Sequence, residues 1–381
     1  MYVLKNKFSI ALIFLFDLIG IIITTPMRLF KGHIKSNIKN ARKILIIRLD
    51  HIGDIIFATS TFRAIKEAYP DAKLHVLINR QNKDIVKHNP YVEQIMTYDA
   101  PWFRRKGKRF IKLAEFLRLA DVLKNEKYDI GIDLRGDLRH IILMSLAKIR
   151  YKIGYGTTGA GFLLDKEVEY RPYAHETEHN ADLLESMGVK YTHRKSEFFI
   201  PQESAKFAQD FYASAGIKGD DFVVCIHPGS GYSSKRWLSK KWAQLTDKLS
   251  YGLKAKVIVI GVRDDKTLIG QIKSMVKTNI IDASGKTSIE QLAAIIKKAN
   301  VFIGTDSGPS HIASAVDTSA VILYSGTNFP SQWAPQNKNI TIIKKDIPCV
   351  GCERQKCPNN ICMDLITVDE VMEAAKHVSR L

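Results

Sequence analysis

The sequence has few cysteines, and those it has are unevenly placed. Only five occur among 381 residues, and four of them lie within residues 349–362. A disulfide framework spread over the chain is therefore absent, which fits a reducing cytoplasm. Cys225 stands alone in the apolar run FVVCIH, where we expect a small core residue. Internal repeats and low-complexity segments are also absent, and a hydrophobic content of 45% excludes general disorder.

The sequence also lacks an uninterrupted apolar run of membrane-spanning length near its N-terminus. Residues 8–23 form the block FSIALIFLFDLIGIII, which Asp17 interrupts. A spanning helix needs about 20 apolar residues, and a central Asp costs roughly 3 kcal/mol to insert. No small-residue cleavage site follows, which argues against a secretory signal. Residues 1–43 carry eight Lys or Arg residues and one acid, so we expect a helix lying in an anionic membrane interface. A helix packed on the protein's own surface and a true membrane span remain alternatives.

Acidic residues are scarce relative to basic ones. Lys and Arg number 57 and Asp and Glu 39, which gives a net charge of +18. Such a charge favours polyanionic partners, namely nucleic acid, an anionic membrane surface or phosphorylated substrates. The charge alone does not choose among these three classes.

What the chain does contain is a regular alternation of apolar runs and helical patterns from Lys43 onward. This alternation predicts an α/β fold with parallel sheets. The expected strands are 43–48, 73–79, 92–98 and 128–134 in a first series, and 222–227, 255–261, 301–304 and 320–324 in a second. Because ligands bind at the carboxyl ends of such strands, we expect two doubly wound domains that face each other across a cleft.

Two glycine-rich matches do not fit the sites they suggest. GYGTTG (154–159) has the spacing of a dinucleotide-binding loop, but the residues after it do not begin a helix, as that site requires. SGKTS (284–288) resembles the end of a P-loop, yet Ile280 stands where that loop requires glycine.

The loop RLDHIGD (48–54) follows the first expected strand. Gly53 permits a sharp turn, and Asp54 falls at or beside the start of a helix. A carboxylate there can act as a general base for a sugar hydroxyl, or it can simply cap the helix. Asp50 is a competing carboxylate, and the local sequence leaves these interpretations open.

Two later strand-to-helix loops have residues suited to phosphate. In HPGSGYSSKRW (227–237), small residues such as Gly229 and Ser230 expose backbone N–H groups, and Lys235 adds a mobile positive charge. A flexible, solvated loop is the alternative. In GTDSGPSH (304–311), an expected helix N-terminus favours phosphate through its unpaired N–H groups and its dipole. The residues placed there are Asp306, Ser307, Gly308, Pro309 and Ser310, followed by His311, which would contact substrate or anchor the loop.

In their order and spacing, these three loops resemble glycosyltransferase family 9, the lipopolysaccharide heptosyltransferases. The resemblance runs from about Lys43 to the C-terminus. It implies a GT-B fold of two Rossmann-like domains, an inverting mechanism and no cofactor required for catalysis. It also implies an acceptor-binding domain at 43–200 and a nucleotide-sugar domain at 201–366. The expected N-terminal membrane-interface segment, 1–42, lies outside the family pattern. The C-terminal helix, 367–381, is expected to pack back on the first domain.

Carried over by motif, the resemblance assigns a role to each loop. Asp54 is identified as the catalytic base, and Lys235 as the lysine that contacts the donor diphosphate. Asp306 to His311 match the donor loop. At the adenosine end the sequence departs from the family, because GVRDD (261–265) offers Asp264 where members often have a Glu. Asp264 would then replace the ribose contact.

A basic and aromatic segment, WFRRKGKRFIKL (102–113), precedes a predicted helix. Arg104, Arg105 and Lys108 are expected to contact phosphate or acidic sugar on the acceptor, or the bilayer, although a plain solvated face would also fit. Arg135 and Arg139, which follow a strand end, are further candidate acceptor contacts.

The clustered cysteines have the spacing C-x2-C-x4-C-x4-C. Cys349, Cys352, Cys357 and Cys362 could close a structural zinc or iron–sulfur site. Reduced or disulfide-paired cysteines are the alternative.

The resemblance therefore implies transfer of a sugar, by default from ADP-heptose, to a lipopolysaccharide core or a related envelope glycan. The expected partners are a nucleotide-sugar donor, a lipid-linked anionic glycan and the inner membrane surface, at its cytoplasmic face; nucleic acid is not expected. One alternative is a GT-B transferase that uses another nucleotide sugar. The other is a non-catalytic protein that binds nucleic acid or membrane.

Overall fold

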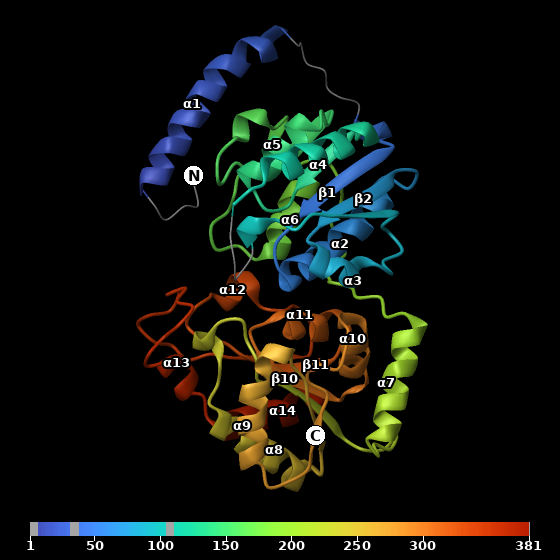
Figure 1. Cartoon of the computed structure of the whole chain (residues 1–381), viewed down its shortest axis with the longest axis vertical. Coiled ribbons are helices and arrows are strands. Elements are labelled where there is room, and N and C mark those ends of the chain that lie inside the picture. The colour runs from blue at the N-terminus through green and yellow to red at the C-terminus, as the bar shows by residue number, and fades with distance from the viewer. Residues whose placement is uncertain (1–6, 31–37, 104–109, 381) are drawn as a thin grey trace. The chain divides into compact units, whose positions relative to one another are not determined.

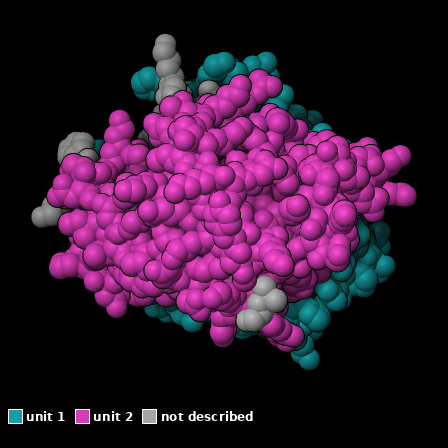
Figure 2. Space-filling model, turned by 90° about the horizontal axis from the view of Figure 1, so that it is seen from below, with its two compact units in different colours: residues 1–194 teal, residues 195–381 magenta. Residues whose placement is uncertain are grey.

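The computed structural model describes residues 7–30, 38–103 and 110–380, and divides into two compact units, 1–194 and 195–381 (Figures 1 and 2). Each unit contains one parallel six-stranded sheet flanked by helices. Over the described residues, no helix combines the length and the apolar character that crossing a bilayer requires.

The first unit has the strand order β3-β2-β1-β4-β5-β6. Its central strand, β1, is buried along nearly all its length, because a parallel sheet with helices on both faces has no solvent-facing side. The strands are β1 (Lys43–Arg48), β2 (Lys73–Ile78), β3 (Gln94–Thr97), β4 (Ile130–Asp133), β5 (Tyr151–Gly154) and β6 (Lys166–Glu167). The helices are α1 (Lys7–Phe30), α2 (Ile52–Ala68), α3 (Lys83–Val86), α4 (Leu113–Glu126), α5 (Leu138–Leu146) and α6 (Glu176–Glu185), with short 3-10 helices η1 (Ile38–Asn40), η2 (Arg80–Asn82), η3 (Pro101–Phe103) and η4 (Gly161–Leu163).

The second unit has the strand order β12-β11-β10-β7-β8-β9. Its strands are β7 (Val223–His227), β8 (Lys256–Val259), β9 (Ile280–Asp282), β10 (Val301–Thr305), β11 (Ser319–Leu323) and β12 (Ile340–Ile343). The helices are α7 (Gln202–Ser214), α8 (Ser239–Leu253), α9 (Lys266–Met275), α10 (Ile289–Lys298), α11 (Gly308–Ala315), α12 (Pro330–Trp333), α13 (Ile361–Asp364) and α14 (Val368–Ser379), with 3-10 helices η5 (Ser233–Lys235) and η6 (Arg263–Asp265).

The C-terminal helix α14 belongs to the core of the second unit. Val371, Met372, Ala375 and Val378 pack in the same apolar cluster as the β10 and β11 side chains. The buried Trp237 ring donates its N–H to the Ile366 carbonyl just before this helix, at 3.1 Å. The apolar face of α14 is therefore used within the second unit, whereas the sequence analysis expected 367–381 to pack on the first domain.

Candidate active site

Both sheets have a topological switch point, where the strand order reverses direction. It lies between β1 and β4 in the first unit and between β7 and β10 in the second. Ligands of doubly wound sheets bind outside the carboxyl ends of the strands at this point. The loops singled out in the sequence, 48–54, 227–237 and 304–311, all leave these strands, together with the loop after β4.

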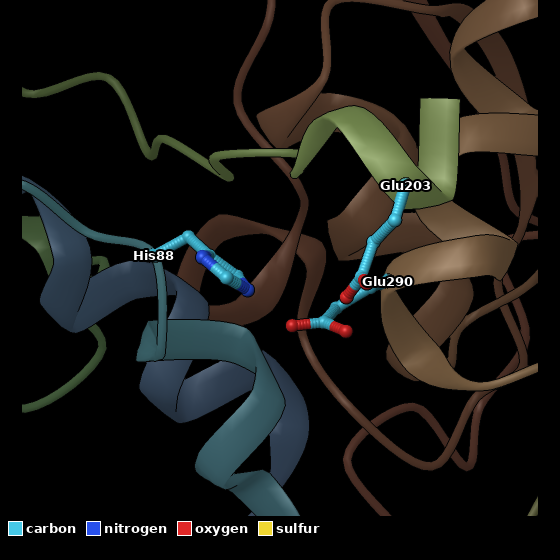
Figure 3. A group of neighbouring side chains, drawn as sticks. All are labelled: His88, Glu203 and Glu290. Carbon is cyan, nitrogen blue, oxygen red and sulfur yellow. The ribbon is translucent and has the colours of Figure 1, made fainter. Parts of the chain in front are cut away.

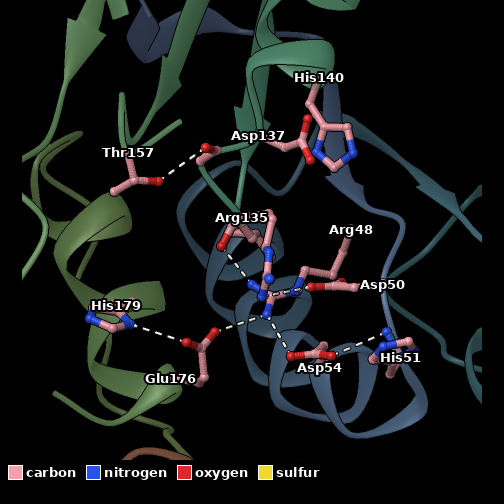
Figure 4. A network of polar contacts seen from close by, with 12 residues as sticks. Arg48, Asp50, His51, Asp54, Arg135, Asp137, His140, Thr157, Glu176 and His179 are labelled. Atoms are coloured by element: carbon pink, nitrogen blue, oxygen red, sulfur yellow. Dashed lines mark hydrogen bonds and ion pairs between the residues drawn. The ribbon is translucent and has the colours of Figure 1, made fainter. Parts of the chain in front are cut away.

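In the first unit, Arg48 is the centre of a buried ion-pair network (Figure 4). The residue is 1% exposed, and its guanidinium contacts three carboxylates: Asp50 and Asp54 at 2.9 Å each and Glu176 at 2.8 Å. It also donates to the Leu134 carbonyl at 2.5 Å. Three acids around one buried cation leave local negative charge. Arg135 offsets part of it, because its guanidinium lies 3.4 Å from the Asp50 carboxylate.

Asp54 both caps a helix and belongs to the charged network. One of its oxygens accepts the backbone N–H of His51, the N-cap residue of α2, at 3.1 Å, and the other accepts from Arg48. Each carboxylate oxygen has two lone pairs, so these contacts leave acceptor capacity for a substrate hydroxyl. The capping role and the base role, which the sequence left as alternatives, are thus compatible in one side chain.

Glu176 reaches the network because α6 packs on α2. Asn180 of α6 donates to the Phe57 carbonyl of α2 at 3.1 Å, which fixes the two helices together. Burial acts to raise the pKa of Glu176, but the Arg48 charge overcomes it and lowers this pKa to about 2. His179 lies 3.3 Å from the other carboxylate oxygen and stacks on Tyr170. Glu176 is therefore a fixed negative charge.

Asp50 differs from Glu176 although both contact Arg48. Burial is the largest influence on Asp50 and raises its pKa to about 6, against the opposing charge of Arg48. Nearby Asp54 adds to the increase. The site therefore pairs a permanently ionised acid with one that changes protonation close to neutral pH.

The loop after β4 arranges two of the predicted acceptor contacts. Asp133, fully buried, accepts three successive backbone N–H groups of this loop and pairs with His140 at 2.9 Å. The Arg139 guanidinium pairs with Asp137 and lies 4.4 Å from the centre of the Trp102 ring. The Arg135 guanidinium lies 5.8 Å from the centre of the Phe103 ring.

The structure thus brings Arg135 and Arg139 together with the aromatic start of the segment 102–113. The other predicted acceptor contacts, Arg104, Arg105 and Lys108, lie outside the described residues.

Several members of this site were missed in the sequence. Arg48 had a usable signal, because an arginine ending an otherwise apolar strand needs buried acids as partners. Asp133 and His140 sit at the end of a strand and the start of the next helix, the same position that drew attention to Asp54. Glu176 had no such signal, since it stands 128 residues from Arg48 in the chain.

In the second unit, Lys235 is buried and ion-paired. Its ammonium lies 2.5 Å from the Asp306 carboxylate, and Asn328 donates to the same carboxylate oxygen at 3.1 Å. The Lys235 side chain is held at the loop after β10, where the sequence placed the donor phosphates. Asp306 thus positions a lysine.

Small residues and hydroxyl groups connect the two loops of the second unit. Thr305 donates to the Gly229 carbonyl at 2.6 Å, and Ser307 contacts the His227 ring at 3.1 Å. Burial lowers the pKa of His227 to about 4, so this ring is neutral at pH 7. Ser307 is the N-cap of α11, Gly308 and Pro309 begin that helix, and Ser310 and His311 are buried in its first turn.

The aspartates at 264 and 265 have different positions. Asp264, predicted as a ribose contact, is exposed. Asp265 is buried, accepts the Val262 N–H at 3.1 Å, and lies 3.7 Å from Arg236. A β-carbon at Gly229 would come within 2.4 Å of its carboxylate, so glycine is required for this close approach. Ser230 accepts from Arg236 through its carbonyl, at 3.2 Å.

The four clustered cysteines do not support the predicted metal site. All five cysteines are free thiols. Across 7–30, 38–103 and 110–380, the cysteines are not part of any set of three ligand atoms close enough to share an ion. Cys362 is buried, whereas Cys349 is exposed.

Two acids approach each other elsewhere in the second unit. Glu203 and Glu290, in the first turns of α7 and α10, have carboxylate oxygens within 4.8 Å of one another (Figure 3). The two helices pack together. The negative charge of each acid interacts favourably with the dipole at the N-terminus of its own helix.

Comparison with known proteins agrees with the fold. The chain belongs to glycosyltransferase family 9 (heptosyltransferase), whose family model matches residues 116–362. Lipopolysaccharide heptosyltransferase 3 of Escherichia coli is 29% identical over 329 residues, which cover 84% of this chain and 95% of that protein.

Solved structures show the same architecture. The glycosyl transferase family 9 protein of Veillonella parvula superimposes with a TM-score of 0.77 at 22% identity, covering 89% of this chain and 97% of that one. Escherichia coli ADP-heptose LPS heptosyltransferase II gives 0.71 at 17% identity, covering 89% and 98%. The predicted family, the GT-B fold and the glycosyltransferase activity are confirmed, and the alternative of a non-catalytic binding protein is wrong.

Proposed function

We propose that this glycosyltransferase transfers heptose from ADP-heptose to the lipopolysaccharide core, with inversion at the anomeric carbon. The observation that carries the proposal is the Arg48 network, which holds the Asp54 carboxylate at the switch point of one sheet. The buried Lys235–Asp306 pair at the switch point of the other sheet supports it. The similarity to Escherichia coli lipopolysaccharide heptosyltransferase 3 supports the choice of acceptor.

The proposed reaction is a single displacement. Asp54 takes the proton of an acceptor hydroxyl as the hydroxyl oxygen forms a bond to the anomeric carbon. The bond from that carbon to the diphosphate oxygen breaks, and its electron pair leaves with the nucleoside diphosphate. Because attack comes from the face opposite the leaving group, the configuration inverts.

Arg48 would hold the Asp54 carboxylate in place for the acceptor, through the ion pair at 2.9 Å. The same guanidinium also contacts Glu176 and Asp50, so its charge is shared among three carboxylates. Asp54 is thus positioned at the switch point without being the only partner of the cation.

The donor loops would stabilise the leaving group. Lys235, the backbone N–H groups at the start of α11 and the small residues Gly229 and Ser230 are suited to a diphosphate on which negative charge grows. Asp306 keeps Lys235 extended toward this position. The proposal assigns no metal or cofactor to the step.

The acceptor would be bound through Arg135 and Arg139. Their positions beside Phe103 and Trp102 offer a guanidinium for phosphate and a ring face for sugar. These contacts support an anionic, lipid-linked glycan as the acceptor, which the enzyme would meet at the cytoplasmic face of the inner membrane.

Nucleotide binding is the first test. The full-length protein is titrated with ADP, GDP and UDP while its melting temperature is followed. Ligand at about 100 times its dissociation constant stabilises by roughly 2.7 kcal/mol, so a shift with ADP alone is expected. A shift with UDP or GDP instead would contradict the ADP-heptose donor and favour another nucleotide sugar, consistent with the exposed Asp264.

Turnover is the second test. ADP release from ADP-heptose is measured with a heptose-deficient lipopolysaccharide acceptor, and the anomeric configuration of the product is determined by NMR. Release with the acceptor and an inverted product are expected. A retained configuration would contradict the single displacement.

A further inference from the structure

Helix α1 presents a broad apolar surface to solvent. Nine large apolar side chains between Leu12 and Ile23 are each 43–63% exposed. Soluble monomers rarely expose contiguous apolar patches larger than a few hundred Å². An exposed apolar surface of this kind indicates an interaction site.

The opposite side of α1 is seated on its own unit. A stripe at helical spacing turns inward, and it contains Ile13, the buried Asp17 and Gly20. Asp17 accepts the backbone N–H of Ala160 at 2.8 Å, and a β-carbon at Gly20 would come within 2.2 Å of the Phe162 ring. The acid that interrupts the apolar block thus fixes the helix to the loop after β5.

The same loop continues to the candidate acceptor site. The Thr157 and Thr158 hydroxyls donate to the Gly136 carbonyl at 3.0 and 2.9 Å. The Leu138 N–H donates to the Thr158 hydroxyl oxygen at 2.8 Å. Gly136 and Leu138 are the chain neighbours of Arg135 and Arg139. Hydrogen bonds at Ala160 and Thr158, together with the backbone between these two residues, therefore connect α1 to the loop that carries the two arginines.

We propose that the exposed face of α1 docks on an anionic phospholipid bilayer, and that its seat on residues 156–162 steadies the Arg135–Arg139 loop when it does. The bilayer is favoured by charge, since residues 1–43 contain eight basic residues and one acid, and that acid, Asp17, is turned inward. A second copy placed on this face would bring two basic segments together, which repel. The link to Arg135 and Arg139 rests on the proposed acceptor role of these arginines, whereas the docking does not.

Vesicle binding tests the docking without any assay of activity. The full-length protein is floated with phosphatidylglycerol vesicles and with phosphatidylcholine vesicles. Strong binding to the anionic vesicles is expected, with a loss of at least about tenfold in Ile22→Glu. Tyr251→Glu, a matched change at an exposed position of α8, should bind as the wild type does.

Three outcomes would overturn the docking. One is equal flotation of wild type and Ile22→Glu. Another is equal binding to the two kinds of vesicle. The third is a stable dimer of the wild type in light scattering that Ile22→Glu converts to a monomer, which would assign the face to a second copy.

Amide hydrogen exchange tests the link to the arginine loop. Exchange in peptides covering 134–140 and 156–162 should slow when the wild type binds anionic vesicles. Asp17→Leu keeps an apolar helix but removes the acceptor for the Ala160 N–H, so it should float normally without this slowing. Gly20→Leu, which collides with Phe162, gives a second variant of the same seat. Slowing that persists in both variants would overturn the link and leave the docking and the proposed transfer intact.

Discussion

The two units have sheets with equivalent strand orders but carry different side chains at the switch point. In both sheets the strand order reverses beside a central strand, β1 in the first unit and β7 in the second. The first unit fills this point with buried charges around Arg48, whereas the second has small residues and one ion pair, Lys235–Asp306. The difference fits the proposed division of roles between the units, because a base needs a fixed electrostatic environment and a diphosphate needs N–H donors.

The proposed base, Asp54, should give the largest effect on activity. Asp54→Asn keeps the size and the helix cap but cannot accept a proton, so kcat should fall by about 10²–10⁴-fold. Initial rates with saturating donor and acceptor measure this. The thermal shift with ADP should be unchanged, since the change lies in the first unit. Activity within a fewfold of wild type would assign the base elsewhere, with Asp50 as the first candidate.

Glu176 should give the largest effect on the pH dependence of stability. Its pKa is lowered from 4.5 to about 2 in the folded protein, so its ionised form stabilises the fold at neutral pH. This stabilisation is present above about pH 4.5 and is lost as the pH falls toward 2, and it amounts to on the order of 3 kcal/mol.

Urea unfolding of wild type and Glu176→Gln between pH 7 and pH 3 tests this expectation. The variant should be less stable at pH 7, and the difference should shrink on acidification. Glu178→Gln, an exchange on the same helix at a more exposed acid, is the control. A constant difference across this range would mean that the Arg48 pair does not stabilise the ionised acid.

Lys235 should give a smaller effect, confined to the donor side. Lys235→Ala removes the cation proposed to stabilise the leaving diphosphate, so kcat/KM for the donor should fall by about 10²-fold. Lys240→Ala, an exposed lysine nearby, should leave it unchanged. A loss of kcat/KM for the acceptor alone, with kcat/KM for the donor unchanged, would contradict the proposed division of roles between the units.

Asp50 should give the smallest effect, a change in the shape of the pH profile. Its pKa is raised to about 6 chiefly by burial, so it loses its proton as the pH passes through this value. The negative charge that appears near Asp54 above pH 6 should strengthen the base. The profile of kcat/KM should therefore rise near pH 6 in the wild type and lose that step in Asp50→Asn. An identical step in the variant would assign it to another group.

Much of this architecture followed from local patterns. The expected strand 43–48 coincides with β1, because an unbroken apolar run bounded by polar residues suits a buried parallel strand. Short or edge strands such as β6 and β12 were not expected, because two to four residues carry too little pattern. The metal site predicted from the cysteine cluster is not supported, since close spacing in sequence does not bring thiols to one point unless the backbone between them folds back.

Sequence alone determined the order of the elements and the chemistry of the loops at the strand ends, because both depend on residues close together in the chain. Asp54, Lys235 and the α11 N-terminus belong to this class. Only the tertiary structure decided what those side chains contact. It joined Arg48 to Glu176, 128 positions away, and turned Asp17 inward onto Ala160, 143 positions away. Such pairs form because buried charges and polar groups must find partners, and the packing of whole helices decides which partner is within reach.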